Sequence, residues 1–163
     1  MLEYEVPAYL ADSNTTMANS SEAFLDIHPA ETVYSIWIGT NDLGLDGFLQ
    51  DSQIAGKTTA DYMECVFSVL DQIHKNGGRY FIVQNLAPLQ LAPLYATPES
   101  NGVFAIESGN PDANVTEISY RMKQTVTTTN DIYKYKTPFE LQVQNRYPGA
   151  HFAVMDMYSI VSI

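Results

Sequence analysis

The sequence has few charged residues and almost no cysteine. Only 17% of its 163 residues are charged, and 19 acidic residues against 8 basic ones give a formal net charge of −11. Nucleic acids and anionic membranes bind through basic faces, so this balance argues against both as partners. The single cysteine, Cys65, cannot form an internal disulfide, and its apolar neighbours predict a buried, inert thiol. Neither cysteine nor histidine spacing predicts a metal site, and no motif calls for a cofactor.

Long apolar runs are also missing. No stretch approaches the length of a membrane span. The stretch Met1–Leu10 has acidic side chains and no apolar centre, so it does not predict a signal peptide. Asn-x-Ser/Thr sequons nevertheless predict glycosylation at Asn14, Asn19 and Asn114, which requires the secretory pathway. Because export is indicated while an export signal is missing, we expect the chain to be incomplete.

The remaining composition is that of one folded domain. Hydrophobic residues make up 45% of the chain, which is typical of globular proteins. A length of 163 residues is enough for one domain with a real core and short for two. Residues 1–163 are therefore interpreted as a single domain.

Three short apolar segments predict strands, at Thr32–Ile38, Arg79–Leu86 and His151–Tyr158. The first lacks clean alternation, so it is expected to be buried on both faces, as in a parallel sheet. The second is expected to be buried in the same way. Since the segments between the strands predict helices, the order indicates right-handed crossovers and a parallel sheet.

Helical patterns have recognisable starts and stops. Thr58 with Asp61 resembles a capping box, and Asn114 is expected to begin another helix. Pro138 is expected to interrupt that helix, and Pro7 to break an N-terminal one. The predicted helices cover Leu2–Ala11, Thr58–Lys75, Asn114–Pro138 and Phe139–Asn145.

The loop after the first predicted strand carries the residues Gly39, Thr40, Asn41 and Asp42. Ligands of parallel sheets lie outside the carboxyl ends of the strands, where this loop is expected. Glycine permits a sharp turn, and Asp42 can hold that turn through backbone N–H groups. The Asn41 amide can donate to a developing oxyanion, which is worth roughly 3–4 kcal/mol of barrier. From these four residues alone, a plain Asx turn is the alternative interpretation.

A longer series of segments resembles the SGNH (GDSL-type) ester hydrolases. The stretch Trp37–Gly44 is similar to the third conserved block of that family. Further segments resemble fungal members, in order along the chain: Leu2–Tyr9, Gly77–Phe81, Ala87–Leu91, Thr137–Leu141 and Arg146–Ala150. The resemblance is strongest to the fungal acetylesterases of carbohydrate esterase family 16. It covers almost the whole chain, apart from residues 13–31.

The resemblance implies a fold and an activity. The fold would be α/β with three layers, a flavodoxin-like parallel sheet with helices on both faces, incomplete at both ends in this chain. The activity would be hydrolysis of small-molecule or oligosaccharide esters by Ser-His-Asp acyl transfer to water, in a secreted protein without a cofactor. Among the family's catalytic and oxyanion-hole residues, only the asparagine of the third block can be carried over, to Asn41.

The family's nucleophile and base have no equivalent here. In the family, the serine follows Gly-Asp and the histidine ends an Asp-x-x-His block near the C-terminus. The pair Asp12–Ser13 lacks the glycine and lies in a polar loop, while Asp71–His74 lies within a predicted helix. His28 is followed by proline as in the family, but its spacing from Asp26 is one residue short and it precedes the third block. His151 opens a predicted strand at its amino end, away from the expected site. We therefore expect this chain to be inactive alone.

Three hypotheses remain open. The chain is an internal part of an ester hydrolase, a non-enzymatic carbohydrate-binding or decoy module on the same scaffold, or an enzyme with a relocated nucleophile. Without the family's first strand, Thr32–Ile38 would form an apolar edge that favours self-association. Phe48 and Tyr95 are candidates for stacking on a sugar ring.

Overall fold

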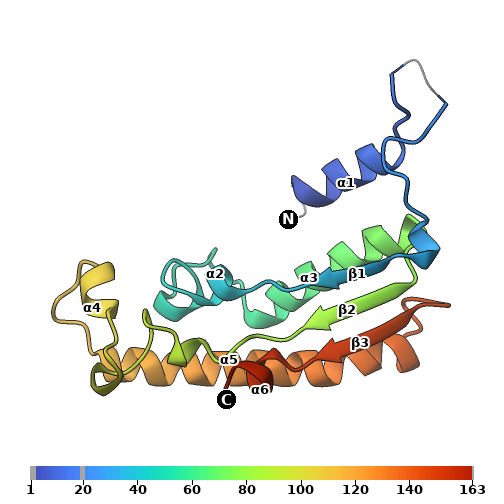
Figure 1. The fold of residues 1–163 in the computed structure, drawn as a ribbon. Helices are drawn as coiled ribbons and strands as arrows, with labels where there is room; N and C mark the ends of the chain where they lie inside the picture. The colour runs from blue at the N-terminus through green and yellow to red at the C-terminus, as the bar shows by residue number, and fades with distance from the viewer. Residues whose placement is uncertain (1–2, 19–20, 163) are drawn as a thin grey trace.

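A three-stranded parallel sheet organises the chain (Figure 1). The computed structural model describes residues 3–18 and 21–162. The strands β1 (Val33–Ile36), β2 (Tyr80–Gln84) and β3 (His151–Met155) lie in the order β1-β2-β3, and both neighbouring pairs are parallel. The sheet and the helices packed around it confirm the predicted α/β fold class.

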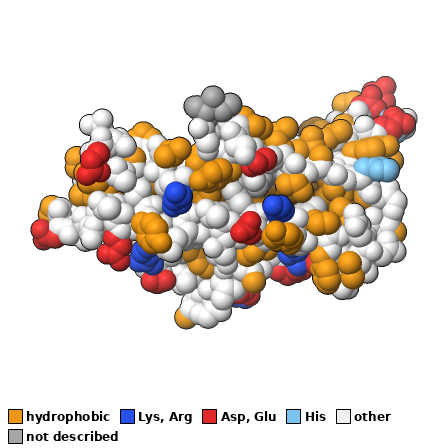
Figure 2. Space-filling model, turned by 90° about the horizontal axis from the view of Figure 1, so that it is seen from below, with side chains coloured by type: hydrophobic (Ala, Val, Ile, Leu, Met, Phe, Trp, Pro, Cys, Tyr) orange, Lys and Arg blue, Asp and Glu red, His pale blue; other side chains and the backbone are white. Residues whose placement is uncertain are grey.

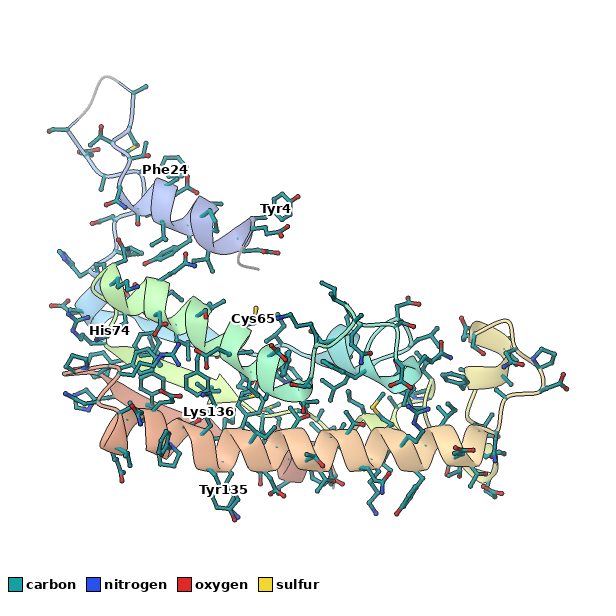
Figure 3. The ribbon with its side chains drawn as sticks, turned by 180° about the vertical axis from the view of Figure 1, so that it is seen from behind. Tyr4, Phe24, Cys65, His74, Tyr135 and Lys136 are labelled. Atoms are coloured by element: carbon teal, nitrogen blue, oxygen red, sulfur yellow. The ribbon has the colours of Figure 1, made fainter. Side chains whose placement is uncertain are left out.

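Two long helices dominate the connections between strands. Helix α3 (Thr59–Lys75) joins β1 to β2, and α5 (Val115–Pro138) lies between β2 and β3 in the chain. Figures 1 and 3 show both helices on the same side of the sheet. The other helical elements are short: α1 (Glu5–Ser13), η1 (Pro29–Glu31), α2 (Thr40–Leu43), η2 (Phe48–Gln50), η3 (Leu89–Leu91), η4 (Pro98–Ser100), α4 (Phe104–Glu107), η5 (Phe139–Val143) and α6 (Met157–Val161).

The predicted starts of both long helices are confirmed. The Thr58 side chain accepts a hydrogen bond from the Asp61 backbone, and the Asp61 carboxylate accepts one from the Thr58 backbone at 2.9 Å. This reciprocal arrangement satisfies two N–H groups that would otherwise lack a helical partner. At α5, Asn114 Oδ1 accepts the N–H of Glu117 at 3.2 Å.

Of the two predicted proline breaks, the one at Pro7 is wrong and the one at Pro138 is confirmed. Helix α1 runs through Pro7, because a first-turn residue has no helical acceptor for its N–H and proline loses nothing there. Leu2, where this helix was expected to begin, lies outside the described residues. At Pro138 the interruption is a change of helix type, since α5 passes into the π-helical turn η5.

The third predicted strand is shorter than expected. It ends at Met155, and the next residue, Asp156, caps α6 by accepting the N–H of Ser159 at 3.2 Å. The capping carboxylate competes with strand pairing by starting a helix. The prediction that the strand reaches Tyr158 is therefore wrong.

The core lies between the sheet and the two long helices. Phe81 and Val83 of β2 point into it and are 2% and 0% exposed. The aromatic rings of Tyr34, Phe81 and Phe152 form a row across the three strands. Burying each large apolar side chain contributes about 1.5–3 kcal/mol, so this face supplies most of the packing energy. Helices α3 and α5 add the following buried side chains: Met63, Val66, Phe67, Leu70, Met122, Val126 and Tyr133.

The opposite face of the sheet is exposed. Val33, Trp37 and Tyr80 are 56%, 53% and 43% exposed, because none of the helices in the described ranges packs over them. The prediction that the first two strands are buried on both faces is wrong for this face. Polar side chains of neighbouring strands bond to each other on this face, where Gln84 Nε2 donates to Ser35 Oγ at 2.7 Å. Within residues 3–18 and 21–162, strand β1 also pairs with a strand on one side only.

The surface along β3 and α5 mixes residue types (Figure 2). Basic side chains lie singly among acidic and hydrophobic ones on the side that Figure 2 shows. In the part of the chain that the structure describes, no helix combines the length and the apolar character needed to cross a membrane.

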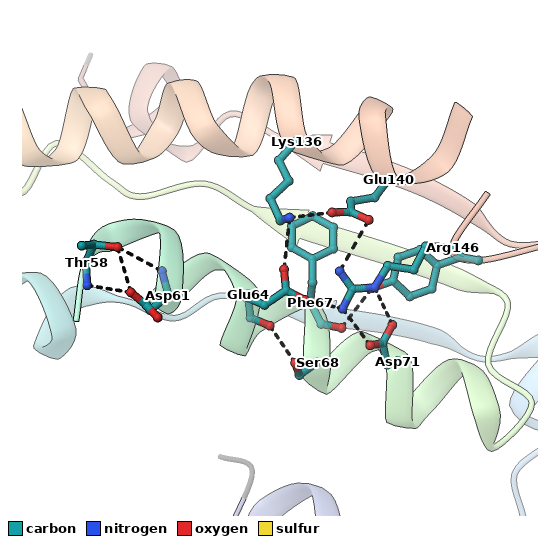
Figure 4. Close-up of polar contacts among 10 residues, drawn as sticks. Thr58, Asp61, Glu64, Phe67, Ser68, Asp71, Lys136, Glu140 and Arg146 are labelled. Atoms are coloured by element: carbon teal, nitrogen blue, oxygen red, sulfur yellow. Dashed lines mark hydrogen bonds and ion pairs between the residues drawn. The ribbon is translucent and has the colours of Figure 1, made fainter. Parts of the chain in front are cut away.

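Five charged side chains, Glu64, Asp71, Lys136, Glu140 and Arg146, form an ion cluster that joins α3 to the end of α5 (Figure 4). Arg146 donates to both carboxylate oxygens of Asp71, at 2.9 and 2.8 Å, and to Glu64 at 2.7 Å. Lys136 binds the carboxylates of Glu64 and Glu140. Since the members come from distant parts of the chain, the ion cluster fixes how α3 and α5 meet.

The ion cluster lowers the pKa of two of its carboxyl groups, those of Glu64 and Asp71. The hydrogen bond from Arg146 is the main cause that lowers the pKa of Glu64. Burial raises the pKa of Asp71, but the hydrogen bonds and charge of Arg146 outweigh it, so the net shift is downward.

Replacing Arg146 with methionine should lower the free energy of unfolding by about 2–3 kcal/mol, because Asp71 loses its bidentate cation in a partly buried place. The matched control is Arg121→Met. Arg121 pairs with the exposed carboxylate of Asp51 at 3.4 Å, and its loss should cost less than about 1 kcal/mol. Urea titration of both variants measures the difference, and equal losses would contradict the structural role of the ion cluster.

Acid should weaken the fold through the same cluster. A carboxyl group whose pKa is lowered by folding stabilises the protein above its unfolded pKa, and that stability is lost as the pH falls through the folded pKa. The ordinary pKa values of Glu64 and Asp71 are 4.5 and 3.8. We therefore expect the free energy of unfolding to fall below about pH 5, and more steeply in the parent chain than in Arg146→Met. If the free energies of unfolding of the two proteins fall equally with pH, the ion cluster is not the cause of the acid sensitivity.

Candidate functional site

The loop singled out by its sequence lies at the carboxyl end of β1. Gly39 precedes the single-turn helix α2, and the N–H of Leu43 bonds to the Gly39 carbonyl at 2.9 Å. Leu43 is completely buried and anchors the turn, while Thr40, Asn41 and Asp42 are exposed. The four predicted residues therefore form one compact turn with its polar side chains accessible.

Gly39 is held in a conformation that suits no other residue. Its φ is +118°, in the region that side chains with a Cβ rarely adopt. A Cβ at this position would also clash with the Tyr62 hydroxyl and would lie 2.8 Å from Leu86 Cδ2. Close packing therefore explains the glycine at the end of β1.

A cleft of about 580 Å³ opens beside the turn, within the size range of small-molecule sites. Asn41 and Asp42 belong to its wall, so the predicted oxyanion-hole donor faces a space that can hold a ligand. The complete lining is Asn41, Asp42, Asp46, Gly47, Phe48, Gln53, Ile54, Lys57, Thr58, Asp61, Tyr62 and Cys65.

Cys65 and Tyr95 differ from their predictions. Cys65 is exposed in this cleft, and Figure 3 shows it projecting from α3 on the side away from α5. Successive residues of a helix point about 100° apart. Cys65 can therefore face solvent although the next two residues, Val66 and Phe67, are buried. Tyr95 is only 5% exposed, so the predicted stacking on a sugar is wrong for its ring. Phe48, the other candidate, is half-buried and lines the cleft.

Polar side chains that the sequence did not single out fasten the ends of β2 and β3. The Asn130 amide bonds to both the N–H and the carbonyl of Leu86, at 2.8 and 2.9 Å. The Asn85 amide donates to Asp156 at 2.9 Å and accepts the N–H of Tyr158 at 3.1 Å. These side chains belong to the wall of a second cleft of about 650 Å³. A polar residue on the inward stripe of a helix, as at Asn130, is the signal that could have revealed this fastening.

The histidines do not form a catalytic pair with a serine in residues 3–18 and 21–162. His74 Nε2 lies 3.2 Å from the Pro148 carbonyl. Asp71 of the same motif is occupied by Arg146, so Asp71–His74 is structural, as expected for a helix surface. His151 stacks on Tyr80 where β3 begins, at the end of the sheet away from Asn41.

Ser13 is also remote from the cleft. The prediction that Asp12–Ser13 lies in a polar loop is wrong, because Ser13 is the last residue of α1 and its hydroxyl donates to the Leu10 carbonyl at 3.0 Å. Asn76, at the end of α3, donates to the same hydroxyl at 3.2 Å. Because α3 ends where the chain returns to the beginning of β2, Ser13 lies at the opposite end of the sheet from Gly39.

The sequons that the structure describes are accessible. Asn14 is exposed, and its amide donates to the Leu10 carbonyl at 2.6 Å. Asn114 is exposed at the start of α5, and its cap uses Oδ1 rather than Nδ2, the atom that would carry a sugar. Asn19 lies outside the described residues.

Comparison with known proteins finds relatives among ester hydrolases. No family model matches the chain. It is 36% identical over 159 residues to an acetylesterase of Hypocrea jecorina, an alignment that covers 96% of this chain and 44% of the relative. It is 23% identical over 170 residues to the GDSL esterase/lipase ACHE of Zea mays, which covers 96% of this chain and 38% of that protein. The chain thus spans less than half the length of either relative.

Gly39→Ala should lower the free energy of unfolding by about 3 kcal/mol, since it combines an unfavourable φ with a steric clash. The control is Gly56→Ala. Gly56 has a φ of +80° and no atom within 4 Å of an added Cβ, so only the conformational cost of about 1 kcal/mol applies. Chemical denaturation of both variants gives the difference. Similar losses would mean that the packing around Gly39 tolerates a side chain.

Proposed function

We propose that this chain, which is related to the GDSL-type ester hydrolases, supplies an oxyanion-hole donor for the hydrolysis of a carboxylic ester. The observation that carries the proposal is the place of Asn41. Its side chain is exposed on the wall of a 580 Å³ cleft, on a turn that ends a strand of a parallel sheet. Similarity to an acetylesterase supports an acetyl ester as the substrate class.

The chemistry of Asn41 suits this role. Attack on an ester carbonyl places negative charge on its oxygen, and an amide N–H can donate to that oxygen. A donor fixed in advance needs no rearrangement during the reaction and contributes roughly 3–4 kcal/mol. The amide is also neutral, so its capacity to donate does not depend on pH.

We propose that the nucleophile and the base are supplied by polypeptide other than residues 3–18 and 21–162, because no serine in those ranges is hydrogen-bonded to a histidine. Enzymes of the Ser–His type keep only the residual rate of the oxyanion hole and of binding when either residue is missing. We therefore propose that the 163-residue chain alone has at most residual activity.

Exposed sequons support secretion as part of the proposal. Asn114 in particular offers its Nδ2 without disturbing the cap of α5, which uses Oδ1. A secreted, glycosylated esterase acting on an acetylated small molecule or oligosaccharide fits the acidic, lysine-poor composition and the relative from Hypocrea jecorina.

The test uses the protein encoded by the longest reading frame that contains this segment, with 4-nitrophenyl acetate as substrate. Asn41→Ala should lower kcat about 100- to 1,000-fold, because one oxyanion donor is lost. Gln124→Ala removes an exposed amide from the surface of α5 and should leave kcat unchanged. An active protein whose kcat is insensitive to Asn41→Ala would overturn the proposal.

The isolated chain tests the hypothesis of a relocated nucleophile. We expect neither turnover above the buffer rate nor labelling of a serine by a fluorophosphonate probe. Turnover equal to that of a complete relative, with a labelled serine, would show a relocated nucleophile instead.

A further inference from the structure

Two buried tyrosines meet the loop on either side of Asn41. Tyr62 of α3 is 7% exposed, and Tyr95, from the connection between β2 and α5, is 5% exposed. A Cβ on Gly39 would clash with the Tyr62 hydroxyl, and a Cβ on Gly44 would lie 2.5 Å from the Tyr95 hydroxyl. Each phenol oxygen therefore lies directly against a glycine of the turn.

The Tyr62 hydroxyl holds the beginning of the turn. It donates to the carbonyl of Ile38, the residue before Gly39, at 2.9 Å. Because a carbonyl can only accept, this bond uses the Tyr62 proton. The Tyr133 hydroxyl, 2.9 Å away, must then donate to the Tyr62 oxygen. A directed chain of two hydrogen bonds thus runs from α5 through α3 to the end of β1.

The Tyr95 hydroxyl holds the other end of the turn. It accepts the N–H of Leu45, one residue after Gly44, at 3.2 Å. The Tyr95 ring is itself fixed in the core, where it packs against Phe104 with a centroid distance of 6.4 Å. Separate elements therefore fasten the turn at its first and last residues.

Burial keeps these hydroxyl groups protonated. It is the largest cause that raises the pKa of Tyr62, and it raises the pKa of Tyr133 to about 12. The negative charge of Asp42 adds to both shifts. Phenols that stay neutral through physiological pH continue to donate, so the chain to Ile38 persists wherever the fold does.

We propose that Tyr62 and Tyr95 are positioning residues for Asn41. They hold residues 38–45 against the sheet, so that the Asn41 amide stays at the cleft wall before a substrate arrives. The inference rests on the proposed oxyanion role of Asn41. It adds that two phenols from outside the turn reinforce its internal anchors, which are the buried side chain of Leu43 and the bond from the Leu43 N–H to the Gly39 carbonyl.

The test compares Tyr62→Phe and Tyr95→Phe with a matched control in the isotope-labelled 163-residue chain. The control is Tyr147→Phe, since Tyr147 is 3% exposed and donates to the Phe67 carbonyl at 2.9 Å, away from the loop. Two NMR readouts are used: the side-chain amide resonance of Asn41, assigned by its loss in Asn41→Ala, and hydrogen exchange of the backbone amides in residues 43–45.

The loop variants, Tyr62→Phe and Tyr95→Phe, each remove a hydrogen bond to the loop. Both should shift the Asn41 amide resonance and speed hydrogen exchange in residues 43–45 by about tenfold, the effect of one lost hydrogen bond. Tyr147→Phe should lower the melting temperature to a similar extent without either local change. If the loop variants behave like Tyr147→Phe, with an unmoved Asn41 resonance, the proposal is wrong.

A milder variant keeps the test decisive if a loop variant fails to fold. Tyr133→Phe removes only the donor to Tyr62 and should give a smaller shift of the same Asn41 resonance. No shift in a folded Tyr133→Phe chain would also count against the proposal. Both NMR readouts are independent of catalysis. If the variants change them as expected but the protein has no esterase activity, the proposed function is wrong while the positioning role of the tyrosines is supported.

Discussion

The hydrogen bond from Tyr62 to the Ile38 carbonyl is the constraint on which the candidate site depends. It joins the end of β1 to α3, and Tyr133 extends it to α5. The hydroxyl occupies the space that a side chain at residue 39 would need, which makes glycine obligatory there. With the strand end fixed in this way, the following turn carries Asn41 to the cleft wall at the carboxyl end of the sheet. The position of one amide is therefore a consequence of packing between three elements.

The ion cluster also holds α3 in place, through Glu64 and Asp71. Arg146 and Lys136 bring the carboxylates of Glu64, Asp71 and Glu140 together, and both cations lie over the Phe67 ring. Tyr62, Glu64 and Asp71 all lie on α3. They pair with Tyr133 and Lys136 of α5 and with Arg146, so these contacts hold α3 against α5 and the segment that follows it. Since α3 also forms one wall of the 580 Å³ cleft, helix packing and the shape of the site are coupled. The exposed outer face of the sheet has no such cover in the described ranges.

Short sequence patterns correctly predicted the features that depend on residues close together in the sequence. The capping box of Thr58 with Asp61 and the cap at Asn114 appear as expected, because they depend on residues three positions apart. The order of strands and helices likewise predicted the parallel sheet. The failures are nonlocal. Tyr95 is buried because Leu45 and Phe104 surround it, and the fastening of Leu86 by Asn130 joins residues far apart in sequence. For the site, the sequence predicted the turn and its asparagine, whereas the tyrosines that contact the turn became visible only in three dimensions.

The most direct test of the oxyanion role is the structure of the protein encoded by the longest reading frame that contains this chain, after covalent reaction with a fluorophosphonate. The phosphonyl group mimics the tetrahedral intermediate, and its oxygen occupies the place of the oxyanion. We expect Asn41 Nδ2 to lie about 2.7–3.1 Å from that oxygen, the distance required of an oxyanion-hole donor. An adduct whose phosphonyl oxygen is bound by other groups, with Asn41 turned away from it, would contradict the central claim.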